Sequence, residues 1–256
     1  MNRKILAIAI ATPFLGLPLI AAATPAFAQA SGSQTYTANL TPVPLNGQNS
    51  ATASVTLSLN GSVATIHETA SGLAATFMGG PFPHVQHIHG GAMGVCPTAS
   101  ADTNHDGLLT TTEGQPAYGP IQTTLSTSGD TSPASGTDIK IAPSGASFTY
   151  DRTITLDSAT LASVTKGIGV VVIHGLDPAT APKPATTLKS ELVPSLPQAA
   201  TAPALCGTLV ASTGAPATGG GSTSGLQDGG LLALGGVGIA AAAGAVGYRR
   251  RVTANR

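Results

Sequence analysis

Basic residues are scarce in the central part of this 256-residue chain, although its formal net charge is zero. Between Ser33 and Ser212 five basic residues face ten acidic ones, which leaves this part with a net charge of −5. It has no basic stripe of the kind that binds phosphate backbones. The sequence therefore argues against nucleic acid as a partner.

Two long segments lack charge, one near each end of the chain. Two basic residues precede an apolar run, and the motif Ala-Phe-Ala follows at residues 26–28, so residues 1–28 are predicted to be a secretory signal peptide. Residues 229–248 have the length of a transmembrane segment, and the basic tail 249–256 would stay in the cytoplasm. We expect an exported protein held at the extracellular face of the cell envelope.

Residues 213–228, just before the apolar segment, are dominated by Gly, Ser, Thr and Ala, which is typical of a flexible linker. Within them the sequence APATG at residues 215–219 differs only in its first residue from the LPxTG sorting pattern of Gram-positive cell-wall proteins. The whole C-terminal arrangement thus resembles a sortase signal. A plain membrane anchor fits equally well.

Cysteine is also scarce, with Cys96 and Cys206 the only two in the chain. An even number of cysteines in an exported protein favours a disulfide. A disulfide between them would close a loop of more than a hundred residues. It would stabilise the fold by about 4–5 kcal/mol in the chain-entropy model. The alternative is two separate buried thiols.

From Ser33 onward, short segments rich in Thr, Val and Ile alternate with Gly, Pro and Asn. Residues 55–69, with Asn60-Gly61 at the centre, predict a β-hairpin. Asp157 or Ser158 can cap one short helix at residues 159–166, and residues 179–202 read as an irregular loop. Further strands are expected at residues 85–89, 121–126, 138–142, 147–156, 168–173 and 206–210. About eight strands and one helix predict an all-β fold, an antiparallel sandwich or barrel.

Four of the six histidines lie between residues 84 and 105. His87 and His89 are two residues apart, so on a β-strand their side chains project from the same face. Two imidazoles placed in this way can share one ion, and imidazole suits copper, zinc, iron and nickel.

Residues 102–113, DTNHDGLLTTTE, match the calcium-loop pattern D-x-[DN]-x-[DN]-G-x5-E at every specified position. The sequence on either side lacks the helical periodicity of an EF-hand, so we expect an EF-hand-like loop inserted into a β-protein. The pattern predicts a calcium site with oxygen ligands from Asp102, Asn104, Asp106, Leu108 and Glu113.

Taken together, these motifs resemble the copper/zinc superoxide dismutases and the related CHRD domains. QHIHGG resembles the dismutase copper strand, and with His84 it also fits the CHRD pattern HxxHIHG. GVVVIHGLDP resembles the strand that ends in the last copper-ligating histidine, here His174, and the two cysteines match the dismutase disulfide pair. The resemblance implies a Greek-key β-sandwich over residues 33–212 with copper at His87, His89 and His174.

Two departures from the dismutase pattern bear on function. Between Cys96 and His174 only His105 is available for a zinc site, which needs more ligands, so no zinc is expected. The arginine that precedes the second dismutase cysteine and guides superoxide is missing before Cys206. Two functions stay open: a metal-dependent protein in superoxide defence, or a non-catalytic CHRD-type module, stabilised by calcium, that binds an envelope component.

His105 is a candidate fourth copper ligand. It follows His89 by sixteen residues, close to the separation of the bridging histidine in the dismutases. It also occupies position 4 of the calcium loop, whose side chain does not bind calcium, so it is free to turn toward the sandwich. The alternative is a solvent-facing side chain.

Overall fold

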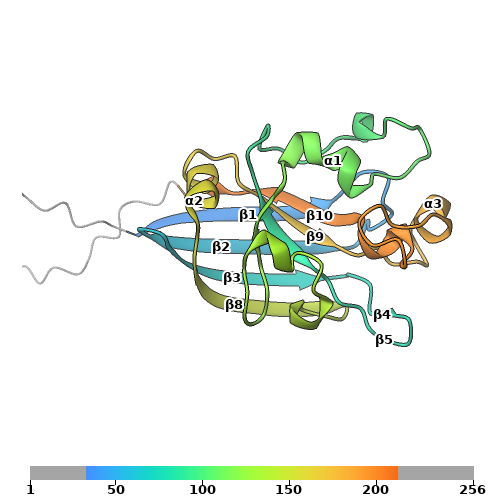
Figure 1. Cartoon of the computed structure of the whole chain (residues 1–256), viewed down its shortest axis with the longest axis horizontal. Coiled ribbons are helices and arrows are strands. Elements are labelled where there is room, and N and C mark those ends of the chain that lie inside the picture. The colour runs from blue at the N-terminus through green and yellow to red at the C-terminus, as the bar shows by residue number, and fades with distance from the viewer. Residues whose placement is uncertain (1–32, 213–256) are drawn as a thin grey trace, which may run out of the picture. The chain divides into compact units, whose positions relative to one another are not determined.

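The computed structural model describes residues 33–212, whose main feature is one curled antiparallel sheet that forms a half-barrel (Figure 1). Its strand order is β7-β6-β9-β10-β1-β2-β3-β8, with β11 beside β1, and β4 and β5 form a separate small hairpin. The strands are β1 (Gln34–Pro42), β2 (Thr52–Asn60), β3 (Val63–Ser71), β4 (Thr76–Phe77), β5 (Gly80–Pro81), β6 (Gln86–His89), β7 (Ile121–Thr124), β8 (Ser147–Thr155), β9 (Val170–His174), β10 (Pro203–Thr208) and β11 (Val210–Ala211).

Three short α-helices and four 3-10 turns lie in the connections: α1 (Thr111–Tyr118), α2 (Ser158–Thr165), α3 (Lys183–Thr187), η1 (Ala99–Ala101), η2 (Pro133–Ser135), η3 (Ile139–Ile141) and η4 (Gln198–Ala200). No helix within residues 33–212 is long and apolar enough to cross a membrane. The predicted signal peptide, linker, APATG motif, transmembrane segment and basic tail lie outside the described residues.

The predicted hairpin is confirmed. β2 and β3 pair along their whole length around Asn60-Gly61, and Gly61 has φ +60°. Along β3 exposed and buried residues alternate without a break, so one face of the hairpin packs on the core and the other faces water.

β6, β9 and β10 are covered on both faces. Ile88, Val171 and Leu205 point into the main core inside the half-barrel. The opposite face of the same strands carries a second apolar cluster, in which Val172 and Cys206 pack against residues of the 96–118 connection. This connection therefore buries a face that would otherwise meet solvent.

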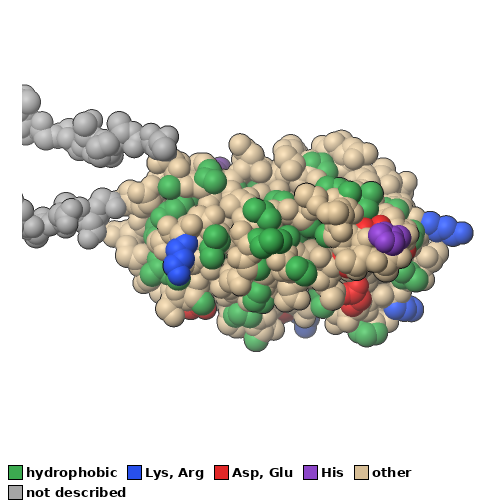
Figure 2. Space-filling view, turned by 90° about the horizontal axis from the view of Figure 1, so that it is seen from above, with side chains coloured by type: hydrophobic (Ala, Val, Ile, Leu, Met, Phe, Trp, Pro, Cys, Tyr) green, Lys and Arg blue, Asp and Glu red, His purple; other side chains and the backbone are tan. Residues whose placement is uncertain are grey.

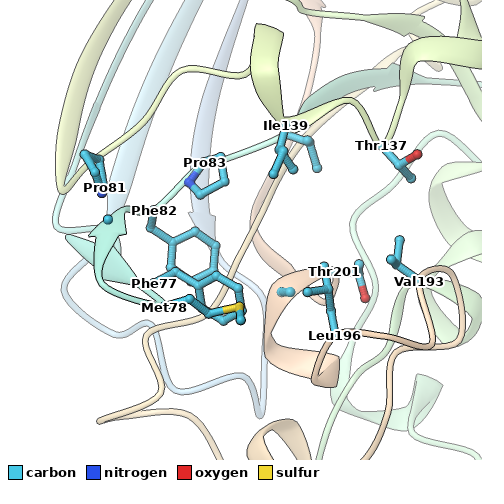
Figure 3. Close-up of a pocket in the computed structure, with 13 residues that line it drawn as sticks. Phe77, Met78, Pro81, Phe82, Pro83, Thr137, Ile139, Val193, Leu196 and Thr201 are labelled. Atoms are coloured by element: carbon cyan, nitrogen blue, oxygen red, sulfur yellow. The ribbon is translucent and has the colours of Figure 1, made fainter.

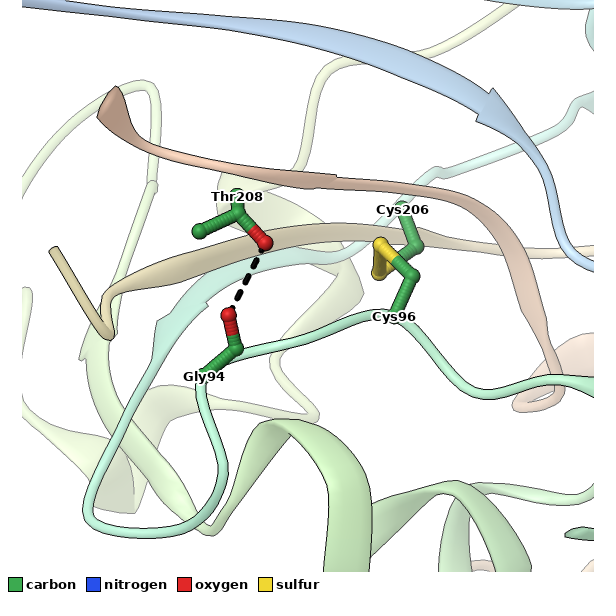
Figure 4. The surroundings of a disulfide bond; sticks show 4 residues. All are labelled: Gly94, Cys96, Cys206 and Thr208. Atoms are coloured by element: carbon green, nitrogen blue, oxygen red, sulfur yellow. Dashed lines mark hydrogen bonds between the residues drawn. A yellow bond between two sulfur atoms is a disulfide. The ribbon is translucent and has the colours of Figure 1, made fainter.

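The predicted disulfide between Cys96 and Cys206 is confirmed, with a Cα–Cα distance of 5.7 Å (Figure 4). Beside it, Thr208 Oγ1 donates a hydrogen bond of 2.9 Å to the Gly94 carbonyl. Both links fasten the start of the covering connection to β10.

The two ends of the strand order are joined by a side chain. Arg152 on β8 donates hydrogen bonds of 2.7 Å to the carbonyls of Ser126 and Gly129, which follow β7. No strand pairing joins β7 to β8, so this guanidinium bridges the seam between the two halves of the sheet.

Two predictions about local structure are wrong. Residues 138–142 contain η3 and no strand, because the Asp138 side chain accepts from the Lys140 amide and closes a tight local turn. The expected helix is present as α2 with Asp157 as its N-cap, but α1 and α3 add two more. α1 begins with a capping box between Thr110 and Glu113, which the sequence pattern T-x-x-E could have disclosed.

Candidate metal centre

Strands β6 and β9 bring three imidazoles together on the covered outer face. His87 lies opposite Val172 and His89 opposite Val170, and His174 ends β9 two residues beyond Val172. Residues opposite each other on paired strands share a face, so all three side chains project to the same side. One ligand nitrogen from each histidine lies within 4.8 Å of those of the other two.

The hydrogen bonds of the triad fix which nitrogens carry protons. His87 Nε2 donates to the Gly136 carbonyl at 2.9 Å. His89 Nδ1 donates to the Gly119 carbonyl and His174 Nδ1 to the Thr201 carbonyl, each at 2.8 Å. A carbonyl oxygen only accepts, so the hydrogen must sit on each of these nitrogens.

The remaining three nitrogens therefore carry lone pairs. His87 Nδ1, His89 Nε2 and His174 Nε2 are all buried, and none has a hydrogen-bond partner. An unpaired buried acceptor is unfavourable by about 1–3 kcal/mol, and here three occur at one place. This is the donor set that a metal ion satisfies, with each imidazole oriented by its other nitrogen.

Burial keeps the triad neutral. It lowers the pKa of His89 to about 3 and that of His174 to about 4, while carbonyl hydrogen bonds oppose the shift. The pKa of His87 falls well below its usual range, first through burial and then through repulsion from His174 and His89. The lone pairs are therefore free for a metal at neutral pH without release of protons.

Helix α1 supports two of the three ligands. Gly119 at its C-terminal end supplies the carbonyl that holds His89, and the Tyr118 ring lies 4.6 Å from the His89 ring. At its first residue, Thr111 Oγ1 donates to the Thr201 carbonyl at 2.7 Å. Gly119 has φ +93°, and a Cβ there would lie 2.0 Å from the Gly90 carbonyl oxygen, so only glycine fits. Backbone carbonyls leave no mark in a sequence, so these supports could not be predicted.

His84 lies next to the triad but is not part of it. Its Nδ1 lies 2.9 Å from the His174 carbonyl and its Nε2 lies 2.9 Å from the Ala74 carbonyl, so both nitrogens face backbone carbonyls. Its ring stacks on Phe82 with centroids 4.8 Å apart. The first histidine of the CHRD-like pattern thus fixes the backbone from which His174 projects.

The acidic loop is closed by its own hydrogen bonds. The Asp102 carboxylate accepts from the amides of Asp106 and Gly107, and Asp106 Oδ1 accepts from the Leu108 amide. Asn104 Oδ1 also accepts from the Asp106 amide. Contrary to expectation, a helix adjoins the loop, because α1 starts at position 10 and carries Glu113 in its first turn.

His105 is not brought to the triad. Its side chain is exposed, and its backbone has φ +59°. Within residues 33–212, the triad is the one group in which three His, Cys, Asp or Glu side chains gather closely enough to hold an ion. The loop carboxylates therefore do not converge in this way.

A cavity of about 300 Å³ borders the triad at His89, with Thr111, Gln115, Tyr118 and Leu192 among its other lining residues. His89 is only 1% exposed. No Asp, Glu, Lys or Arg lines the cavity, and Figure 2 shows only a few scattered charged side chains on one face of the molecule. The three ligand nitrogens are themselves buried, and no basic side chain in the cavity attracts an anion.

Comparison with family models, curated proteins and solved structures gave no match, so the functional argument rests on the geometry of the site.

Proposed function

We propose that this chain is an exported, surface-anchored protein that binds one copper ion through His87 Nδ1, His89 Nε2 and His174 Nε2. The observation that carries the proposal is the convergence of three buried lone pairs that have no hydrogen-bond partner. Three neutral imidazoles with an open position form a site that suits redox-active copper. The three carbonyls that orient the rings complete the arrangement expected around a metal.

We further propose that the fold is of the copper/zinc superoxide dismutase and CHRD type. β1, β2 and β3 pair in chain order and β10 lies beside β1, which resembles the 4-1-2-3 order of a Greek key with β4 to β9 inserted before the returning strand. The disulfide and the copper histidines also occur in the order that the resemblance implies. No second cluster of this kind forms in residues 33–212, so the proposal contains no zinc site.

Superoxide is the substrate that this resemblance suggests. The bound copper would supply the electron transfer, and the protein would hold the ion and limit access through the cavity at His89. No basic side chain lines that cavity, so the site lacks a local source of electrostatic guidance for an anion. Turnover should therefore be slow for a dismutase.

The second candidate function is a non-catalytic envelope module that binds an envelope component. The near-complete burial of the triad favours it, because an ion held there would have little contact with solvent. In that case calcium at Asp102, Asn104, Asp106, Leu108 and Glu113 would stabilise the domain, and the triad would have no catalytic role.

Metal analysis of the protein purified from its native envelope without an affinity tag tests the proposal. We expect about one copper per chain, lost in His174→Asn and retained in His67→Asn. His67 is a suitable control because it is exposed and paired with Asp151 on the solvated face of the sheet. Calcium without copper, or equal copper in both variants, would overturn the copper proposal, and superoxide consumption by the copper-loaded protein separates the two functions.

A further inference from the structure

A second and larger cavity, of about 420 Å³, lies between the β4–β5 hairpin and two connections, residues 137–139 and 193–201 (Figure 3). Phe77, Met78 and Phe82 lie on one side of it, and Val193 and Leu196 lie across from them. No charged side chain lines the cavity, and the only polar ones are Thr137 and Thr201. Its volume lies within the range of small-molecule sites, which are mostly apolar with a few polar groups.

The aromatic wall of this cavity favours a ring-containing ligand. Phe77 and Phe82 lie with ring centroids 4.7 Å apart and planes tilted by 43°. Such a wall gains from offset or edge contacts with a further ring. The Thr201 hydroxyl is already hydrogen-bonded to Ser190 at 2.7 Å, so the site offers little to a strongly polar molecule and nothing to neutralise a charge.

The rim carries apolar side chains in unusual positions. Met78 is 82% exposed and Ile139 is 55% exposed. Met78 and Gly79 have φ values of +50° and +86°, a conformation that favours Asn, Asp or Gly at the first position. A methionine there is conformationally unfavourable, and it places a flexible apolar side chain where an occupant would cover it.

The wall of the cavity also contains the supports of the metal centre. Thr201 lines it, and the Thr201 carbonyl holds His174 Nδ1. Thr137 lines it and directly follows Gly136, whose carbonyl holds His87 Nε2. Val85 lines it, and its carbonyl accepts from the His174 amide at 2.9 Å. An occupant therefore contacts the segments that orient two of the three imidazoles.

We propose that this cavity binds one small, uncharged, largely apolar molecule, with an aromatic ring against Phe77 and Phe82, and that its occupancy changes the affinity of the triad for metal. The coupling between the cavity and the triad rests on the copper proposal, whereas the binding of the small molecule in the cavity does not. Coupling between two sites is reciprocal, so metal must change the affinity for the ligand by the same factor.

The neutral fluorescent probe N-phenyl-1-naphthylamine tests the binding, and the chain has no tryptophan to interfere. We expect saturable binding of one probe per chain. Ile139→Asp should weaken it at least tenfold, and Val210→Asp should not, although both residues are 55% exposed. If Ile139→Asp does not fold, Met78→Asp replaces it as the test variant. Met93→Asp, at another exposed methionine, is then the control. Unsaturable binding, or equal loss in the variant and its control, overturns the proposal.

Copper titrations with and without saturating probe test the coupling. We expect the copper Kd to change at least threefold, and the probe Kd to change by the same factor when copper is bound. If the probe binds and copper does not, the copper proposal fails and the apolar site stands. If copper binds and the probe does not, the apolar site fails. If both bind with unchanged Kd values, the coupling is wrong.

Discussion

The two halves of the sheet bury their strands in different ways. On β2 and β3 every second residue faces water, and these exposed positions are mostly Ser and Thr. On β6 and β9 every residue is buried, because the 96–118 connection covers the face that points away from the core. The candidate metal centre lies on this second covered face. Its imidazoles are therefore shielded from solvent, and they do not interrupt the packing of the main core. The difference shows that the segments packed over this face, and not the sheet alone, make the site.

The largest expected effect comes from detaching this cover. Replacing both Cys96 and Cys206 with alanine removes a cross-link between residues 110 positions apart. The loss should be about 4–5 kcal/mol of unfolding free energy in the chain-entropy model, measured by urea denaturation. Amide exchange should rise more in the 96–118 connection than in β2 and β3. An equal rise in both regions would show that the disulfide does not serve the cover in particular.

Glu68 is the exception in the solvated half, since it points inward from β3 opposite Tyr150 with no hydrogen bond to its carboxyl group. Burial raises its pKa from 4.5 to about 8, against a smaller lowering by the nearby Gln86 side chain, and burial also raises the pKa of Tyr150 to about 12. The folded state therefore holds a proton that the unfolded state releases, so stability falls as pH rises from about 4.5 to 8.

Glu68→Gln should remove this pH dependence and stabilise the protein by roughly 3–5 kcal/mol above pH 8. Unfolding free energies between pH 5 and 9 check it, with the exposed Glu191→Gln as the matched control. Parallel pH profiles for the wild type and Glu68→Gln would mean that the carboxyl group is ionised or hydrated in the folded state.

Calcium should stabilise the covered half through the loop that precedes α1. At one hundred times its Kd it should add about 2.7 kcal/mol, seen as a higher melting temperature. Glu113→Gln should abolish the gain, although glutamine can still form the capping box with Thr110. An unchanged melting temperature in the wild type, with identical behaviour of Glu113→Gln, would disprove the calcium site.

Copper titrations with and without calcium test the role of His105. α1 runs from the loop to Gly119, which holds His89, so copper affinity should fall when calcium is removed even in His105→Ala. A copper affinity that falls in His105→Ala with calcium present would instead support His105 as the fourth ligand.

The smallest expected effect concerns the seam between the two halves. Arg152→Gln removes the guanidinium that donates to the carbonyls of Ser126 and Gly129. We expect a loss of roughly 1.5–3 kcal/mol, because hydrogen bonds to charged groups contribute about this much. Lys166→Gln, at an exposed position, is the control in the same denaturation experiment. Equal stability of the two variants would mean that the seam holds without Arg152.

The solvated half of the sheet, around β2 and β3, could be predicted from the sequence better than the covered half around β6 and β9, for a physical reason. Alternation and Asn60-Gly61 are local signals, and they predicted β2 and β3 correctly. α1 contains Gly114 and Pro116, which disfavour a helix, and it exists because of its capping box and the packing of Tyr118. The pair His87 and His89 was visible from its spacing, and His174 only from the family resemblance, because a long-range strand pairing brings it near.

The central claim, that three named nitrogens of the triad bind copper, is tested most directly by NMR of ¹⁵N-histidine-labelled protein titrated with copper(I), which is diamagnetic. The account predicts that His87 Nδ1, His89 Nε2 and His174 Nε2 change shift together at one equivalent. Their partner nitrogens should keep the protons that they donate to Gly136, Gly119 and Thr201. A response at His67 or His105 in place of the triad, or proton loss from the partner nitrogens, would contradict it.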